Sequence, residues 1–528
     1  MHLDLLSLGL LPPMPAAFCG GNDLDLLEPL RFVSGDGMPD LADAHLDRSA
    51  LAEALAVANA SYGHVDAQGQ AALLADPATQ VVVTGQQPGL FGGPLYTLSK
   101  AVAAARWADR LRSVGIPAVS VFWVATEDHD FVESSRATFL VGGRPETVTL
   151  GEDTAPLMPV GMRVLGEGVT VALQQLRDAS RSERFADWLD VVEQWYTPSA
   201  RFGEAFSRLL CHLLGDRSPL LLDAMNPAVK EAEAPWMRTL VEQRGRLQAA
   251  VMDREERIGS RGYRLQVNPQ PEASPLFLYQ QGARRRIIWL EGGRWGLRGL
   301  PEFSAEPEEL LSILDENPGV VSPGVLARPA MQDALLGTCM SILGPGELSY
   351  LPQAAPVYEV LGISPPSVSL RPQIMVLEEF QMTRMTELGV SLSDLVVPDL
   401  DIDSLVAHLL GDDFVAPAAE QIDATLEAMR PSAMSLDTNL DRPYERTRDQ
   451  IRRSLEAFSN KVSGAVARRN EVATRRVEGL REVCCPGGKL QERVVCTAHY
   501  PGKYDLAFVD RLWEQMSLSP TEMQVITP

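Results

Sequence analysis

The sequence predicts an α/β fold that combines a parallel sheet, β-rich insertions and an α-helical coiled-coil domain. The first observation is a strand–loop–helix–strand order. The apolar run Val81–Val83 leads through a glycine-rich loop and a helix opening at Pro94 to a second apolar run, Ala118–Ala125. Such alternation is typical of a parallel sheet. The other two observations are later stretches of alternating apolar and polar residues, and a heptad pattern in the C-terminal third.

The chain before the first core strand is expected to pack onto the domain rather than to direct export. Residues 1–18 are rich in leucine, but no Lys or Arg precedes the apolar run, Asp4 lies inside it, and Pro12 and Pro13 break it. A signal peptide has the opposite features. Residues 41–75 show helical spacing of apolar residues. No apolar run approaches the ~20 residues that a membrane helix needs, so we expect no membrane partner.

Two β-rich insertions interrupt the core. Residues 136–170 and 263–300 alternate apolar and polar residues around glycines, a pattern that predicts short antiparallel strands. The other elements expected before residue 350 are, in order, a helical stretch at 171–214, a buried strand at Leu220–Asp223, a helix through about Ile258, a short helix at 306–314 and a strand at Cys339–Leu343.

The C-terminal third is predicted to be helical. One long helix is expected between Tyr444 and Leu480, where Ile451, Leu455, Phe458, Val462 and Ala465 step by four and three residues, as in the seam of a coiled coil. The register slips after Arg469. A shorter helix with the same steps precedes it, ends at Pro431, and is expected to pair with it in antiparallel orientation.

The predicted organisation has three parts. Residues 1–375 form the core, with inserted connecting segments at about 136–215 and 260–305. Residues 376–483 form the helical domain, and residues 484–528 pack back on the core. The length of 528 residues also suggests roughly three domain-sized units.

Composition excludes some classes of protein. The net charge of −23 argues against a nucleic-acid partner, which requires a basic face. Six cysteines without a C-x-x-C pair argue against a disulfide framework or a thiolate zinc site, and we expect reduced thiols in a cytoplasmic protein.

The glycine loop is the first candidate for chemistry. Glycines at 85, 89, 92 and 93 let backbone amides approach an anion, and the helix that follows adds partial positive charge. The loop is equally compatible with a tight turn, because its spacing matches no nucleotide-binding motif. The neighbouring polar side chains favour a binding role; they are Thr84, Gln86, Gln87, Tyr96 and Lys100.

A second cluster follows the next strand, at Glu127, Asp128, His129 and Asp130. Three carboxylates in four positions repel one another unless a cation binds, and the group is suited to a substrate ammonium, Mg²⁺ or a basic side chain. The alternative is a negatively charged turn that caps a helix. Its position at the end of a buried strand favours function, with His129 as general acid or base.

Two further segments carry polar groups near strand ends. Arg328, Gln332 and Asp333 open one predicted helix, where ordinary capping is the alternative interpretation. Gly344, Gly346, Glu347 and Tyr350 follow the strand at Cys339–Leu343 and are suited to read a small polar substrate. The basic run Arg284–Arg286 is interpreted as a solvated face, with contact to an anionic substrate as the lesser alternative.

Five segments together resemble BshC, the family of cysteine-adding enzymes of bacillithiol biosynthesis. They read TGQQPGLFGGPLYTLSKA, PAVSVFWVATEDHDFVE, VSPGVLARPAMQD, GPGELSYLPQ and GGKLQERV and occur in the order of the family. The first 40 residues match poorly. Ser134, Ser135 and Arg136 stand where the family usually has a Val-Asn-His element, and Leu336-Gly337 replaces its Leu-Pro.

The resemblance implies a Rossmann-like core related to class I aminoacyl-tRNA synthetases and nucleotidylyltransferases, with a coiled coil that forms a homodimer. It implies a ligase that joins the carboxyl of cysteine to the amine of glucosaminyl-malate, in the last step of bacillithiol biosynthesis. It also implies an adenine nucleotide, ATP or ADP, and Mg²⁺ is compatible with the acidic cluster. The HIGH and KMSKS signatures of synthetases are absent from the sequence.

On this hypothesis the loop amides at 85–93 cradle phosphates or malate carboxylates, and Lys100 offsets developing charge. His129 takes the proton of the attacking amine, while Glu127, Asp128 or Asp130 holds the ammonium of cysteine. The hypothesis requires the chain near residues 89 and 129 to face a shared cavity. Two alternatives remain: a nucleotidyl transferase acting on another small acid, and a coiled-coil scaffold with a degenerate core.

Overall fold

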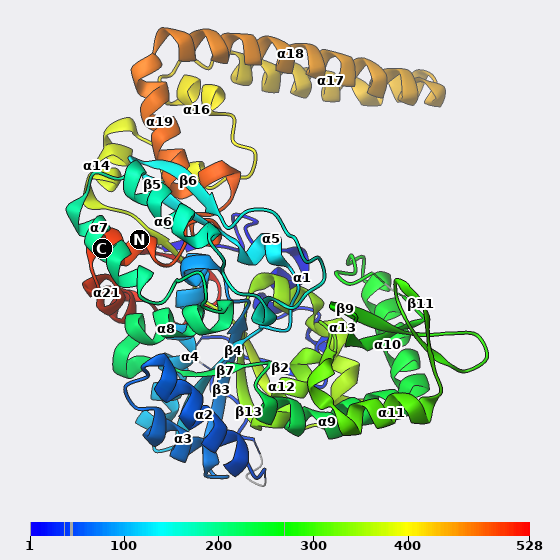
Figure 1. Ribbon diagram of the computed structural model, residues 1–528. Helices are drawn as coiled ribbons and strands as arrows, with labels where there is room; N and C mark the ends of the chain where they lie inside the picture. Colours follow the sequence, from blue (N-terminus) through cyan, green and yellow to red (C-terminus); the bar gives the residue numbers. More distant parts are fainter. Residues whose placement is uncertain (1, 36, 43–45, 269) are drawn as a thin grey trace.

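The computed structural model describes residues 2–35, 37–42, 46–268 and 270–528. Among these residues, six parallel strands form the central sheet in the order β2-β14-β13-β3-β4-β7 (Figure 1). The strands are β2 (Arg31–Phe32), β3 (Gln80–Gln86), β4 (Ala118–Val124), β7 (Leu220–Asp223), β13 (Thr338–Leu343) and β14 (Ser367–Leu370). The predicted parallel α/β fold is confirmed.

Helices cover both faces of this sheet because its strands are apolar on both sides. Val81 and Val83 of β3 pack into one core cluster with α2 and α3, whereas Val82 packs into the other with α4. The covering helices are α2 (Ser49–Tyr62), α3 (Ala67–Ala75), α9 (Pro227–Glu242) and α12 (Arg328–Leu336) on the first face, and α4 (Leu95–Ser113) and α8 (Phe202–Leu214) on the second.

The strand order reverses between β3 and β13. From β3 the chain moves through β4 to β7 on one side, and it later returns to build β13 and β14 on the other side. Ligands of open α/β sheets bind beyond the carboxyl ends of the strands at such a reversal. The fold therefore places a binding crevice after Gln86, Val124 and Leu343.

Both β-rich insertions are confirmed. The first contains the hairpin β5 (Arg136–Val141) and β6 (Arg144–Thr149), followed by α6 (Gly168–Ala179) and α7 (Glu183–Glu193). The second is a sheet in the order β11-β10-β9-β8-β12, flanked by α10 and α11 (Figure 1). Its elements are α10 (Arg244–Ser260), β8 (Ala273–Gln280), β9 (Ala283–Trp289), β10 (Trp295–Leu297), β11 (Leu300–Ala305), α11 (Pro307–Glu316) and β12 (Val321–Pro323).

The C-terminal helices form an arm that projects from the body (Figure 1). Its hairpin, α17 (Val415–Leu436) and α18 (Asp441–Arg469), is antiparallel as predicted, because Asp423 pairs with Arg448 while Arg430 pairs with Asp441. The other helices after β14 are α13 (Pro345–Leu361), which precedes that strand, α14 (Glu379–Leu388), α15 (Leu392–Leu395), α16 (Ile402–Leu409), α19 (Glu471–Cys484), α20 (His499–Tyr504) and α21 (Ala507–Gln515).

Three predicted helix boundaries are wrong. The long helix does not run from Tyr444 to Leu480, because it breaks at Asn470, whose φ of −120° is not helical. The break falls where the heptad register slips. The shorter helix does not end at Pro431, since Pro431 lies inside α17 and the helix continues to Leu436.

The helix expected at 41–75 is also different. Residues 43–45 lie outside the described residues, and helix α2 begins only at Ser49. Gly63, in the left-handed conformation with φ of +82°, ends α2, and α3 starts at Ala67. The sequence therefore forms two helices in place of one.

The two ends of the chain meet in one small sheet. Strand β16 (Glu522–Ile526) lies between β1 (His2–Asp4) and β15 (Gln373–Val376), and Figure 1 shows both termini side by side. Helix α1 (Pro13–Cys19) follows, with Met14 and Phe18 buried. The N-terminal segment thus packs on the protein, as expected.

A buried ion pair joins the C-terminal segment to the core. Arg371, just after β14, forms two hydrogen bonds to Glu492, at 2.8 Å from Nη1 and 2.7 Å from Nη2. Both side chains are at most 2% exposed. The same carboxylate accepts from the Ile374 amide at 3.0 Å, so Glu492 ties the segment to the chain that enters β15.

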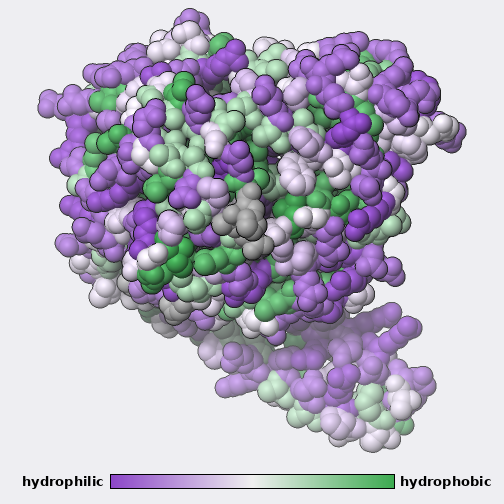
Figure 2. Space-filling model, turned by 90° about the horizontal axis from the view of Figure 1, so that it is seen from below, coloured by the Kyte–Doolittle hydropathy of each residue, from purple (hydrophilic) through white to green (hydrophobic). Residues whose placement is uncertain are grey.

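The surface and the cysteines agree with the sequence. All six cysteines are free thiols. Among the described residues, no helix is both long and apolar enough to cross a membrane. Figure 2 shows that the face below α2 and α3 is largely hydrophilic, with apolar residues in scattered patches.

Replacing Glu492 by Gln is expected to lower the free energy of unfolding by about 3–5 kcal/mol, because it leaves the buried Arg371 without its counter-charge. Urea unfolding followed by circular dichroism measures the change. The control is Glu471→Gln, from an exposed pair with Arg475, which should move the midpoint little. Equal midpoints for the two variants would contradict the assignment.

Candidate active site

A cavity of about 460 Å³ lies at the carboxyl ends of β3, β4 and β13, where the strand order reverses. The inserted sheet and the C-terminal segment close its other sides. The polar side chains that line it are Gln86, Gln87, Tyr96, Lys100, Glu127, Asp128, His129, Glu133, Arg284, Arg286, Arg328, Glu347, Tyr350, Arg371 and Arg493. Gly85, Gly344 and Gly346 line it with their backbone.

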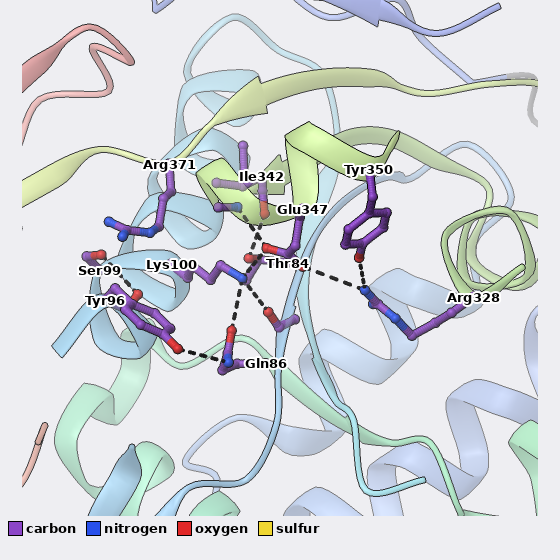
Figure 3. Close-up of polar contacts among 12 residues, drawn as sticks. Thr84, Gln86, Tyr96, Ser99, Lys100, Arg328, Ile342, Glu347, Tyr350 and Arg371 are labelled. Atoms are coloured by element: carbon purple, nitrogen blue, oxygen red, sulfur yellow. Dashed lines mark hydrogen bonds and ion pairs between the residues drawn. The ribbon is translucent and has the colours of Figure 1, made fainter. Parts of the chain in front are cut away.

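Lys100 is the centre of one wall (Figure 3). Its Nζ donates to the Gly85 carbonyl at 2.7 Å and to Gln86 Oε1 at 3.2 Å, and it forms an ion pair with Glu347. Only 2% of the side chain is exposed. Burial lowers the pKa of Lys100, and the Glu347 carboxylate opposes that shift. Lys100 thus carries a charge that the fold itself compensates.

Glu347 is placed by the start of helix α13. Its carboxylate accepts from the Gly344 amide at 2.7 Å, in the reciprocal capping arrangement typical of a helix N-terminus. Burial is the largest single effect on its pKa and raises it, but Lys100, Arg328 and these hydrogen bonds together hold the pKa below the usual value. Glu347 is therefore an anion that orients cations.

Arg328 and Tyr96 complete this wall. Arg328 Nη2 donates to the Tyr350 hydroxyl at 2.8 Å and lies 3.7 Å from Glu347 (Figure 3). On the other side, Gln86 Nε2 donates to the Tyr96 hydroxyl at 3.2 Å. The guanidinium of Arg371 lies 5.1 Å from the Tyr96 ring centre.

Glu127 does not face a substrate ammonium, contrary to the sequence-based expectation. Its carboxylate forms an ion pair with Lys230 of α9, whose Nζ also lies 2.8 Å from Glu233. All three residues are at most 5% exposed. The cation that the acidic cluster requires is thus supplied by the chain. No local pattern connects residues so distant in sequence.

Asp128 and His129 lie at the cavity wall. Gln87 Nε2 donates to Asp128 Oδ2, and Asp128 Oδ1 accepts from the His129 amide at 2.6 Å. The His129 side chain is 31% exposed. Burial and the Arg284 guanidinium lower its pKa, whereas Asp128 and Asp130 oppose the shift. Asp130 does not line the cavity; it accepts from the Glu133 amide at the start of α5 (Phe131–Ser134).

The interpretation of Arg284–Arg286 as a solvated face is wrong. Arg284 is 7% exposed and lies in the cavity wall beside His129, and Arg286 lines the same cavity. Arg285 points elsewhere, to the Gly299 carbonyl. The alternation of a strand places positions 284 and 286 on one face. That signal was present in the sequence, but the direction of the face depends on tertiary packing.

The glycine loop does not supply free amides. The Gly92 amide donates to the Tyr196 hydroxyl at 3.0 Å and the Gly93 amide to the Leu90 carbonyl at 3.1 Å. The Thr497 amide in turn donates to the Gly93 carbonyl. Gly92 has φ of +87°, and a Cβ there would lie 3.0 Å from Thr497. Gly89, Gly92 and Gly93 are packed under the C-terminal segment because this close approach requires glycine.

The two chain corners do face a shared cavity, but the first corner is Gly85–Gln87 and not residue 89. Thr84, Gln332 and Asp333 lie behind the wall, around a separate cavity of about 20 Å³. Burial raises the pKa of Asp333 to about 6, and Tyr358 donates to it at 2.5 Å. Residues 134–136, where the sequence departs from the family, do not line the main cavity.

No group of three or more His, Cys, Asp or Glu side chains among the described residues has a geometry that could hold a metal ion. The expected phosphate cradle of glycine amides is likewise filled by the chain itself. Arginines are the groups suited to anions here, because their planar donors fit carboxylates and phosphates. Arg284, Arg286 and Arg328 contribute them from two elements, β9 and α12.

Comparison with known proteins identifies a family. Residues 37–372 match the model described as "Bacillithiol biosynthesis BshC, N-terminal Rossmann-like domain". Residues 374–528 match the model described as "Bacillithiol biosynthesis BshC, C-terminal coiled-coil domain". The first match starts at residue 37, in agreement with the poor resemblance of the first 40 residues.

Three relatives share the name "Putative cysteine ligase BshC". A protein of Salinibacter ruber is 31% identical over 495 residues, with 91% of this chain and 89% of the relative covered. A protein of Solibacter usitatus is 29% identical over 463 residues, with 86% and 85% covered. A protein of Heliobacterium modesticaldum is 30% identical over 456 residues, with 84% and 82% covered.

Replacing Lys230 by Met is expected to make stability depend on pH. Burial raises the pKa of Glu233, and loss of Lys230 removes the attraction that opposes this. The folded variant then binds protons that the unfolded chain releases near neutral pH, so its stability falls as pH rises. The drop in Tm relative to the parent protein should be larger at about pH 8 than at about pH 5.5.

The control for this measurement is the double variant Lys230→Met/Glu233→Gln, which keeps only one of the two buried carboxyls. It should recover part of the Tm lost at the higher pH. A Tm loss that is the same at both pH values would contradict the buried three-residue ion cluster.

Proposed function

The chain belongs to the BshC family of bacillithiol biosynthesis, and on that premise we propose that it forms an amide between the carboxyl of cysteine and the amine of glucosaminyl-malate. This reaction would be the last step of the pathway. The observation that carries the proposal is a cavity rich in cations, at the reversal point of the sheet, in a chain whose net charge is −23. The ligands best suited to that cavity are small acids.

The arrangement of the arginines supports a substrate with more than one acidic group. Arg286 has no hydrogen bond to any described residue, and its guanidinium lies 4.5 Å from the Phe277 ring centre. Arg328 approaches from the opposite wall, next to Glu347. The two carboxylates of a malate group, or one carboxylate and a phosphate, match donors on separate walls.

The acidic side of the cavity supports the amine of cysteine. Asp128 is 39% exposed at the wall, next to His129. Glu127 is excluded from this role by Lys230, and Asp130 lies outside the cavity. Asp128 is therefore the carboxylate that we assign to the cysteine ammonium, where Gln87 fixes its orientation.

An adenine nucleotide fits the arginines and not the glycine loop, whose Gly92 and Gly93 amides have partners in the chain. Arg284, Arg286 and Lys100 would neutralise its phosphates. Bound there, the nucleotide would supply the activation that a free carboxylate needs for amide formation. If Mg²⁺ accompanies it, the phosphates would supply most of its ligands, as is usual for this ion.

The arm supports a homodimer. Phe458 of α18 and Met429 of α17 are 52% and 59% exposed, although both belong to the heptad seam. Apolar seam residues that one hairpin leaves exposed are normally covered by another helix. The projection of the hairpin from the body leaves room for the same hairpin of a second copy (Figure 1).

The proposed reaction is tested by mass spectrometry of protein mixed with cysteine, glucosaminyl-malate, ATP and Mg²⁺. The expected product has the summed mass of the two substrates less one water, and AMP or ADP accompanies it. Pyrophosphate release without cysteine would favour the alternative nucleotidyl transferase. Absence of product together with absence of glucosaminyl-malate binding by calorimetry would contradict the ligase.

The same assay tests the cavity with a matched pair of variants. Arg286→Gln should raise KM for glucosaminyl-malate by about 10- to 100-fold, the effect of losing a charged hydrogen bond. Arg285→Gln, on the opposite face of the same strand, should leave KM unchanged.

Phe458→Asp is expected to convert the dimer into a monomer, because it places a charge in the apolar seam. Light scattering after gel filtration measures the mass. Phe380→Asp is the matched control, since Phe380 is also 52% exposed but lies on α14, outside the hairpin. A monomeric parent protein, or equal masses for both variants, would rule out the hairpin as the interface.

A further inference from the structure

His129 is contacted by a group that can only donate. Arg284 Nη1 lies 3.4 Å from His129 Nδ1. A guanidinium has five N–H donors and no acceptor, so a hydrogen bond between the two requires Nδ1 to be the acceptor. A neutral imidazole carries one proton, and that proton must then be on Nε2. The contact thus selects one of the two neutral tautomers.

Arg284 is held so that it cannot turn away from the ring. Its Nε donates to the Ser322 hydroxyl at 2.8 Å, and its Nη2 donates to the Pro323 carbonyl at 2.7 Å. The guanidinium also stacks on Phe277, 3.9 Å from the ring centre. With Nε and Nη2 fixed by β12 (Val321–Pro323), Nη1 is left to face His129.

The charged form of His129 is disfavoured by the same neighbour. An imidazolium would place an N–H against the guanidinium N–H groups, and burial and Arg284 both lower the pKa of His129. The other charged groups around the ring are Arg163, which lowers the pKa further, and Asp128 and Asp130, which raise it. Asp128 Oδ1 lies 3.8 Å from Nδ1, too far for a hydrogen bond.

We propose that Arg284 locks His129 as the neutral Nε2–H tautomer, so that His129 donates a hydrogen bond to the substrate's acyl oxygen and does not accept the proton of the attacking amine. No described residue hydrogen-bonds to Nε2, and the ring lines the cavity. The catalytic part of this inference rests on the ligase function proposed above, whereas the tautomer does not. It replaces the proton-acceptor role expected from the sequence.

In the reaction, the free amine of the sugar attacks the acyl carbon of activated cysteine and forms the C–N bond. The carbonyl π pair moves onto oxygen, where the Nε2–H of His129 stabilises the developing charge. When that pair re-forms the carbonyl, the leaving oxygen departs with its bonding pair, and the extra proton of the amine passes to water. Arg284 is a positioning residue in this scheme, because it acts through His129.

The tautomer is measured directly by long-range ¹H–¹⁵N NMR of the full chain labelled with ¹⁵N-histidine, and His129 is identified by the signal lost in His129→Gln. The expected pattern is a protonated Nε2 and an unprotonated Nδ1 from about pH 6 to about pH 9. In Arg284→Met the His129 pKa should rise toward the usual value and the tautomers should mix. Arg286→Gln should leave the pattern unchanged.

An Nδ1–H pattern, or a charged ring at about pH 7, would overturn the proposal. This result is independent of turnover, so it is decided even if the proposed ligase reaction is not observed. It is also decided by the parent protein alone if Arg284→Met does not fold.

The catalytic role is measured with two substitutions at one position. The amide nitrogen of Gln can occupy the place of Nε2 and donate, but it cannot accept a proton. His129→Gln should therefore keep kcat within about 10-fold of the parent, whereas His129→Ala should lose about 10²- to 10³-fold, as for removal of one oxyanion donor. Equal losses in the two variants would show that His129 is not a donor.

Discussion

The cavity depends on the ion pair between Lys100 and Glu347. Lys100 lies on the helix that follows β3, and Glu347 on the helix that follows β13, so the pair joins the two strands between which the strand order reverses. The lysine also donates to the Gly85 carbonyl at the end of β3. A buried charge without its partner is strongly unfavourable, and each half of the sheet therefore requires the other to be in place.

This constraint explains why several acidic and basic residues near the cavity do not meet a ligand. Glu127 is neutralised by Lys230, Glu347 by Lys100, and Arg371 by Glu492. The groups left to bind substrate are those whose charge the fold does not compensate in full, which are Arg286 and Asp128. Net charge of a motif is therefore a poor guide to its ligand, and pairing of each group is the better one.

The sequence predicted the parts of the fold and site that depend on local pattern. Strand-end residues such as Gly85, Gln86, Asp128 and Glu347 were found because apolar strands end visibly, and parallel strands end on one side. The sequence could not show that Arg284 meets His129, because these residues are 155 positions apart and meet only through the packing of the inserted sheet. It also could not show that Thr497 covers Gly92, 405 positions away.

The site is consequently a property of the whole chain. The core contributes Lys100 and His129, the inserted sheet contributes Arg284, and the C-terminal segment contributes Arg493 and, through Glu492, the orientation of Arg371. Helix α19 leads from the arm directly into that last segment. Pairing of two arms would therefore restrain the segment that closes the cavity, and a coiled coil is then a physically reasonable companion of this core even though its seam residues lie outside the cavity.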